Sequence, residues 1–153
     1  MKPKAYIFDI DGTLADCSHR LHHITGDTTN WDAFYAACFG DAVIKNVAEV
    51  FKALGDYEDN VLILLTGRSN RVYEETSDWI WVHFELSSYN GDVELFMRPD
   101  GDHRPDYVIK REIYEREIKD KYDVIGVFED RQRCVDMWRA LGLTCFQVAP
   151  GDY

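Results

Sequence analysis

The sequence predicts an α/β fold in three layers, built on a five-stranded parallel sheet. Five short apolar runs rich in β-branched and aromatic residues alternate with longer segments of helical period. This alternation is typical of a parallel sheet that helices cover on both faces. With 153 residues, of which 46% are hydrophobic, the chain can build one domain with a core and is short for two. We therefore expect residues 1–153 to form a single domain.

The strands are predicted where apolar runs are too short for helices. They comprise Ala5–Phe8, Val61–Leu65, Val93–Met97, Val124–Phe128 and Thr144–Val148. A helix is predicted over residues 43–54, whose apolar face holds Val43, Val47, Val50, Phe51 and Leu54. A second helix repeats this spacing after the fourth strand, with Cys134, Val135, Trp138 and Leu141. Gly55 and Gly142 stand where glycine commonly ends a helix.

Residues 15–41 form an insert in which no strand is expected. Two short helices are predicted there, one beginning near Ser18 and one capped by Asn30. Because the insert follows the end of the first strand closely, we expect it to contact substrate.

The chain is acidic, with 28 Asp and Glu against 17 Lys and Arg and a formal net charge of −11. Such a protein repels long nucleic acid as a whole, so a phosphate-bearing partner must be held by local contacts. The four cysteines form no C-x-x-C pair, which predicts reduced thiols in a cytoplasmic protein and no disulfide. The short N-terminal lead and the lack of a long apolar run predict neither a signal sequence nor a membrane segment.

Polar residues of the kinds that bind metal ions and phosphate groups follow three of the predicted strands. Because ligands bind at the carboxyl ends of the strands in a parallel α/β sheet, these residues should converge on one spot. They are Asp9, Asp11, Thr66, Gly67, Arg68, Glu129 and Asp130. The carboxylates suit a hard cation such as Mg²⁺, whereas the hydroxyl and the guanidinium suit a phosphate. Taken alone, the segment Asp-x-Asp-Gly-Thr could be an ordinary turn. The polar motifs at the ends of two other strands favour a functional site instead.

The motifs FDIDGTL, LLTGR, Lys110 in YVIKREI, and VFEDR resemble the four motifs of the haloacid dehalogenase (HAD) superfamily of phosphatases. The resemblance implies a Rossmann-like HAD fold in which the insert is a minimal cap. The stretches MRPDGDHRPDYVIKREI and EDRQRCVDMWRALGLTCFQVAPGDY further resemble the 3′-phosphatase domain of phage polynucleotide kinase-phosphatase. That family removes 3′-phosphates from nucleic acid ends and nucleotides.

The resemblance also implies roles for the core residues. Asp9 would attack phosphorus and form an aspartyl-phosphate, and Asp11 would act as the general acid and then the general base. Thr66 and Lys110 would hold the phosphoryl oxygens. Mg²⁺ would be bound by Asp9, by the main-chain carbonyl of Asp11 and by Asp130.

Further residues match the narrower family. Arg20 and Arg68 match positions that contact substrate phosphate, Gly67 lies in the same motif as Arg68, and Asp106 matches an acidic residue near the lysine. We expect all four to bind substrate. Glu129 departs from the family, which commonly has two aspartates there. Its extra methylene would displace a metal ligand, so we expect Glu129 to be a partner of Lys110 beside the metal ligands.

Three groups of residues have two interpretations each. His19, His22 and His23 could grip phosphate, but the solvated face of a short helix is favoured. Trp79 and Trp81 could stack on a base, but a core position is favoured. The loop at residues 98–104 could be a mere connection, or its cations Arg98, His103 and Arg104 could steer and bind substrate.

The expected function is Mg²⁺-dependent hydrolysis of 3′-phosphomonoesters at DNA or RNA ends and in 3′-nucleotides. A small-molecule phosphatase for 5′-nucleotides or sugar phosphates is an alternative, because the insert sets the substrate. A non-catalytic phosphate-binding scaffold is a further alternative, against which the presence of both Asp9 and Asp11 argues. No P-loop pattern G-x-x-x-x-G-K-[ST] occurs. A kinase or ligase activity could therefore come from a separate partner. A homodimer is also possible.

Overall fold

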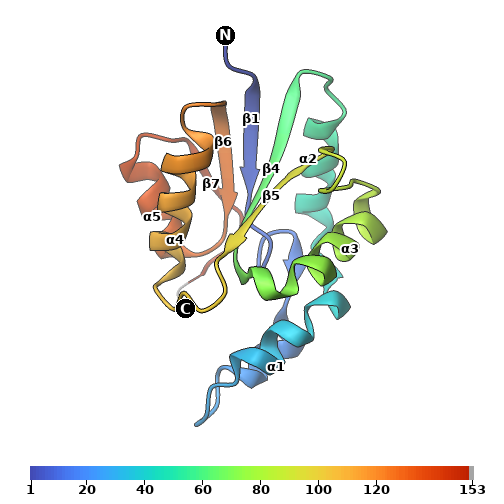
Figure 1. The fold of residues 1–153 in the computed structure, drawn as a ribbon, viewed down its shortest axis with the longest axis vertical. Coiled ribbons are helices and arrows are strands. Elements are labelled where there is room, and N and C mark those ends of the chain that lie inside the picture. The colour runs from blue at the N-terminus through green and yellow to red at the C-terminus, as the bar shows by residue number, and fades with distance from the viewer. Residues whose placement is uncertain (152–153) are drawn as a thin grey trace.

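A five-stranded parallel sheet forms the centre of the computed structural model, which describes residues 1–151 (Figure 1). The strand order is β5-β4-β1-β6-β7, and every neighbouring pair is parallel. The strands are β1 (Lys4–Phe8), β4 (Asn60–Ser69), β5 (Glu94–Arg98), β6 (Asp123–Glu129) and β7 (Cys145–Gln147). All five predicted strands are confirmed. The second is longer than predicted because β4 continues through the TGR motif to Ser69.

Helices cover both faces of the sheet and confirm the three layers (Figure 1). On one face lie α2 (Lys45–Gly55) and α3 (Tyr73–Phe84), the latter preceded by the 3₁₀ turn η3 (Asn70–Val72). On the other lie α4 (Asp106–Ile113), its π-helical extension η4 (Tyr114–Ile118), and α5 (Gln132–Ala140).

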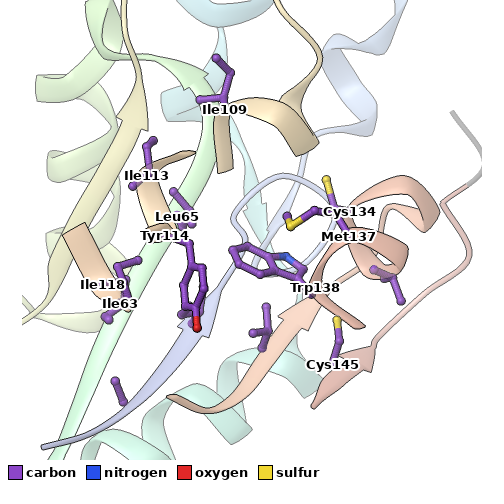
Figure 2. Packing of buried hydrophobic residues seen from close by; sticks show 14 residues of the cluster. Ile63, Leu65, Ile109, Ile113, Tyr114, Ile118, Cys134, Met137, Trp138 and Cys145 are labelled. Carbon is purple, nitrogen blue, oxygen red and sulfur yellow. The ribbon is translucent and has the colours of Figure 1, made fainter. Parts of the chain in front are cut away.

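Apolar side chains pack between the sheet and its helices on both faces of the sheet. Figure 2 shows one cluster, in which Trp138 of α5 meets Tyr114 edge to face, with ring centroids 5.7 Å apart. On the opposite face, Phe8 of β1 stacks on Phe128 and meets Phe51 of α2 edge to face. Aromatic pairs of this kind add about 0.5–1.5 kcal/mol beyond their buried area. The core therefore holds the sheet rigidly beneath the strand ends.

The insert lies beyond the carboxyl end of β1 (Figure 1). It contains η1 (Ser18–His23), α1 (Trp31–Ala36) and η2 (Cys38–Gly40), and the predicted cap is confirmed because the Asn30 side chain accepts from the Ala33 amide at 3.0 Å. The expectation that no strand occurs was wrong. Residues of β2 (Ala15–Asp16) pair antiparallel with β3 (Ala42–Val43). This short ladder joins the two ends of the insert. Because each strand has only two residues, the sequence carries no pattern from which this long-range pairing could be predicted.

Three details of the predicted helices were also wrong. The first helix begins at Lys45 because Val43 belongs to β3, and Val50 is exposed rather than buried. Gly55 is the last residue of α2 and has no positive φ, whereas Gly142 follows α5 with φ 84°, as its predicted role requires.

The four cysteines are buried and free, which agrees with the absence of a predicted disulfide. Within residues 1–151, none of the helices combines the length and the hydropathy that crossing a bilayer requires.

Candidate active site

The floor of the site is the segment that leaves β1. Asp9 and Asp11 follow Phe8 directly, and Gly12 turns the chain with φ 85°, a conformation that favours glycine. This turn places Thr13 beneath the carboxylates. Its hydroxyl lies 3.2 Å from Asp9 Oδ2 and 3.3 Å from Asp130 Oδ1, so it can donate to either. The turn therefore links the ends of β1 and β6.

Lys110 reaches this floor from α4 and is almost completely buried. Its Nζ donates to Asp9 Oδ1 and to Glu129 Oε2, both at 2.8 Å. Burial alone would lower the pKa of Lys110, but the charges of Asp9 and Glu129 raise it well above its usual value. The lysine therefore stays protonated, and the contact predicted between Lys110 and Glu129 is present.

Three carboxylates meet beside the lysine. One oxygen from each of Asp9, Glu129 and Asp130 lies within 4.8 Å of the others, and all three side chains are buried. Burial, followed by repulsion from Glu129, raises the pKa of Asp9 despite the opposing charge of Lys110. A divalent cation would relieve this crowding of negative charge, and an all-oxygen donor set suits Mg²⁺. The residues present thus fit a metal of that class.

Asp11 turns its carboxylate away from that cluster and toward two arginines. Arg20 Nη2 donates to Asp11 Oδ1 at 2.6 Å, and Arg68 Nη2 donates to the same oxygen at 2.7 Å. Burial would raise the pKa of Asp11, but Arg68 and then Arg20 outweigh it and hold the pKa below its usual value. Asp11 is therefore ionised in this arrangement. Its predicted contribution to a metal site, through the main-chain carbonyl, stays a prediction.

Asp41 completes this network, and sequence reasoning missed it. The carboxylate is 2% exposed and accepts from Arg20 Nε at 2.8 Å and Nη2 at 2.6 Å, and from Arg68 Nη2 at 3.0 Å. It also contacts His19 Nε2 at 2.7 Å, while His19 itself is exposed on η1, in agreement with the favoured solvated interpretation. No motif surrounds Asp41. Its only signal was its place at the end of the insert.

The remaining histidines and the tryptophans of α3 follow simpler patterns. His22 is exposed on η1, as the favoured interpretation required, and its ring lies 4.0 Å from that of His23. Trp79 is a core residue whose Nε1 donates to the Asp41 main-chain oxygen at 2.8 Å. Trp81 is 55% exposed, so the core interpretation was wrong for it.

The TGR motif forms the adjoining wall. The Arg68 amide donates to Thr66 Oγ1 at 3.1 Å, and Thr66 is fully buried. A Cβ at Gly67 would lie 3.1 Å from the Cβ of Asp106, so glycine suits the close approach of these segments and a larger residue would push Asp106 aside by a few tenths of an ångström. Asp106 in turn accepts from Arg131 Nη1 at 2.7 Å. Gly67 and Asp106, both predicted to bind substrate, are thus direct neighbours.

Arg98 at the end of β5 and Arg104 in the loop between β5 and α4 already have protein partners. Arg98 donates to the main-chain oxygens of Gly67, at 2.8 Å, of Asp102, at 2.9 Å, and of Arg104. Arg104 pairs with Asp102 at 2.8 Å and with Glu112 at 2.6 Å. Arg98 therefore shapes the loop, and the substrate-binding role of Arg104 stays a prediction.

A cavity of about 600 Å³ opens above these residues. Most of the predicted site residues line it, namely Asp9, Asp11, Thr66, Gly67, Arg68, Arg104, Asp106, Glu129 and Asp130. Lys110 and Arg20 do not line it, since both are buried behind the residues that they contact. The structure thus brings together the residues predicted from three strand ends, and two buried cations support them from behind.

Known proteins resemble this chain along its length. The family model described as the polynucleotide kinase PNKP phosphatase domain matches residues 3–153. A protein of Autographa californica nuclear polyhedrosis virus, described as a bifunctional polynucleotide kinase/RNA ligase, is 33% identical over 147 residues. These residues are 95% of this chain and 19% of the viral protein.

Solved structures give the same comparison in three dimensions. A chain of the Pnkp1/Rnl/Hen1 RNA repair complex is 35% identical with a TM-score of 0.79, and the match covers 99% of this chain and 44% of that one. A second structure of the complex gives 35% identity, a TM-score of 0.80, and coverage of 99% and 47%. CbbY from Rhodobacter sphaeroides, at 15% identity and a TM-score of 0.58 over 100% of this chain and 88% of its own, shares only the fold. This chain spans less than half the length of the relatives that are 33% and 35% identical to it.

Proposed function

This chain belongs to the family of polynucleotide kinase PNKP phosphatase domains, within the HAD superfamily, and from that premise we propose its reaction. It is a Mg²⁺-dependent phosphatase that hydrolyses 3′-phosphomonoesters of DNA or RNA ends and of 3′-nucleotides. The observation that carries this proposal is the arrangement of Asp9, whose carboxylate is held by Lys110 within 4.8 Å of two further carboxylates at the strand ends.

In the first step, a carboxylate oxygen of Asp9 forms a bond to phosphorus while the ester bond to the sugar 3′-oxygen breaks. Lys110 fixes the position of that carboxylate and offsets its charge. Thr66 and Arg68 line the cavity where the transferring phosphoryl oxygens would lie. A cation held by Asp9 and Asp130 would offset the repulsion between the nucleophile and the phosphate.

Asp11 supplies and removes the protons. It donates one to the departing 3′-oxygen, and it later accepts one from the water that attacks phosphorus and releases Asp9 and inorganic phosphate. In the present arrangement its carboxylate is held by Arg20 and Arg68, which disfavour the protonated form. A substrate phosphate that binds Arg68 would compete for this guanidinium and raise the pKa of Asp11. Substrate binding would thus prepare the acid for the first step.

We further propose that the chain works with a kinase or a ligase. The viral relative is described as carrying both activities, and the structural relatives come from a complex described as one of RNA repair. Because this chain corresponds to less than half of each, the complementary activities would come from other segments or other proteins.

The proposed function is tested by phosphate release from matched oligonucleotides and mononucleotides that carry either a 3′- or a 5′-phosphate, with Mg²⁺ or with EDTA. We expect release from the 3′ position that requires the metal and falls at least about a thousandfold in Asp9→Asn, because the nucleophile is lost. Asp59→Asn is the matched control, since Asp59 is exposed just before β4, the strand whose opposite end enters the site.

Two other outcomes would overturn parts of the proposal. Preferential release from 5′-nucleotides would retain the chemistry and overturn the substrate assignment. Binding of the phosphorylated substrates without any hydrolysis would indicate the non-catalytic scaffold instead.

A further inference from the structure

The cavity above Asp9 has two unlike walls. The loop between β5 and α4 contributes charged residues to one wall, whereas the insert contributes a mainly apolar wall with Leu21, Ile24, Trp31 and Tyr35, in which Asp32 is the one charged residue. Hydrolysis of a phosphate group needs only the polar floor and the cations beside it. The apolar wall therefore has no role in the reaction as described, and it is free to contact the rest of a molecule whose phosphate lies above Asp9.

Trp31 is the most prominent side chain of this apolar wall. It is the first residue of α1 and is 49% exposed, although it lines the cavity. Its ring meets Phe34 edge to face at 5.6 Å and Tyr35 at 5.9 Å. Phe34 is itself buried beneath the Arg20 guanidinium, whose Cζ lies 4.2 Å from the ring centroid. The indole is thus anchored through Phe34 to the catalytic network and leaves about half of its surface open.

The charge of the protein adds a second reason for an uncharged contact. With a formal net charge of −11, the chain cannot gain affinity for a polyanion from its overall field. Arg98 and Arg104 at the cavity already bind protein acceptors. Stacking of a base on an aromatic ring strengthens binding about tenfold or more and tolerates any sequence, because every base has a π face.

We infer that Trp31 is a substrate-binding residue that stacks on the base of the 3′-terminal nucleotide. This inference rests on the proposed function and specifies its substrate class: a phosphomonoester whose sugar carries a nucleobase. Trp81 provides the contrast within the chain. It is 55% exposed on α3 but does not line the cavity.

The inference is tested with two 3′-phosphorylated oligonucleotides that differ only in whether the last nucleotide carries a base or is abasic. The measured quantity is the ratio of kcat/KM for the two substrates. In the wild type we expect the normal terminus to be preferred about tenfold or more, from the stacking contribution above. The preference should fall to near one in Trp31→Leu, which keeps an apolar contact to Phe34 but lacks a flat ring. Trp31→Phe should retain most of it, and Trp81→Leu should retain all of it.

Several outcomes would overturn the inference. A wild-type ratio near one would do so, and so would an equal loss on both substrates in Trp31→Leu, which would indicate a merely structural role. If the wild type acts on 5′-nucleotides and on no 3′-phosphate, the proposed function fails by itself, and the ratio between a 5′-nucleotide and ribose 5-phosphate then tests Trp31. If no phosphomonoester is hydrolysed, dissociation constants of the same oligonucleotide pair replace the rates in the same comparison.

Discussion

Asp41 shows how a single residue outside the cavity can control the site. Its buried carboxylate holds both arginines that bind Asp11, and Trp79 holds its main chain from the core. Two guanidinium groups with no solvent contact need such a counter-charge, because an unpaired buried charge is costly. Asp41 is therefore a positioning residue, which acts through Arg20 and Arg68.

Asp41→Asn is expected to destabilise the protein by about 3 kcal/mol, since it removes one partner of a buried ion-pair network. kcat/KM should fall about tenfold or more, because the arginines lose their orientation. The apparent pKa of Asp11 in the pH profile should also move up, because the contacts from Arg68 and Arg20 that hold it low are weakened. Urea unfolding and pH–rate profiles measure these effects. Asp27→Asn, an exposed change within the insert, is the control, and equal stability of the two variants would contradict the prediction.

At the scale of elements, the insert is attached to the sheet by contacts of very different strength. The β2–β3 ladder closes its base, and the buried network of Asp41 fixes its interior. At its outer edge, Arg71 from η3 pairs with Asp32 of α1 at 2.7 Å, but these side chains are 45% and 80% exposed. Exposed ion pairs contribute little because water and salt screen them.

We therefore expect Asp32→Asn to lower the free energy of unfolding by less than about 1 kcal/mol. The effect should shrink further in high salt, in contrast to that of Asp41→Asn. Thermal and chemical unfolding at two salt concentrations measures both. A loss above about 2 kcal/mol would mean that the outer edge, rather than the buried network, holds the insert in place.

At the scale of the whole molecule, the charge distribution limits what kind of nucleic acid can bind. The negative net charge repels a long polyanion, while Arg68, one of the two arginines beside Asp11, lines a cavity of about 600 Å³. This charge distribution favours the proposed action on chain ends, with few phosphates in contact.

Affinity should accordingly change little with substrate length and with salt. For single strands, the logarithm of affinity falls with the logarithm of salt concentration by about 0.7 for each neutralised phosphate. With one or two contacts, we expect a slope no steeper than about −1.5 at constant Mg²⁺, and similar KM values for short and long 3′-phosphorylated strands. Unphosphorylated duplex DNA should not compete. A steep slope, or a KM that falls with length, would show an extended binding surface instead.

The sequence by itself determined the sheet, the helical layers and most of the floor of the site. Apolar runs of five or so residues between helical segments have few other solutions, and strand ends of a parallel sheet must meet at one edge. Asp9, Thr66 and Asp130 could be placed together for that reason. The β2–β3 ladder could not, because two-residue strands carry no periodicity.

Only the tertiary structure decided which charges face one another and which aromatic side chain faces the cavity. Asp41 and Trp31 lie in an insert without repeating pattern, so nothing local distinguishes them from Asp32 or Trp81. Their roles arise from packing between segments far apart in the chain, which brings Asp41 to Arg68 and Trp31 to the wall above Asp9. Periodicity reports local structure and burial, whereas ion pairs and cavity walls depend on contacts that only the folded chain creates.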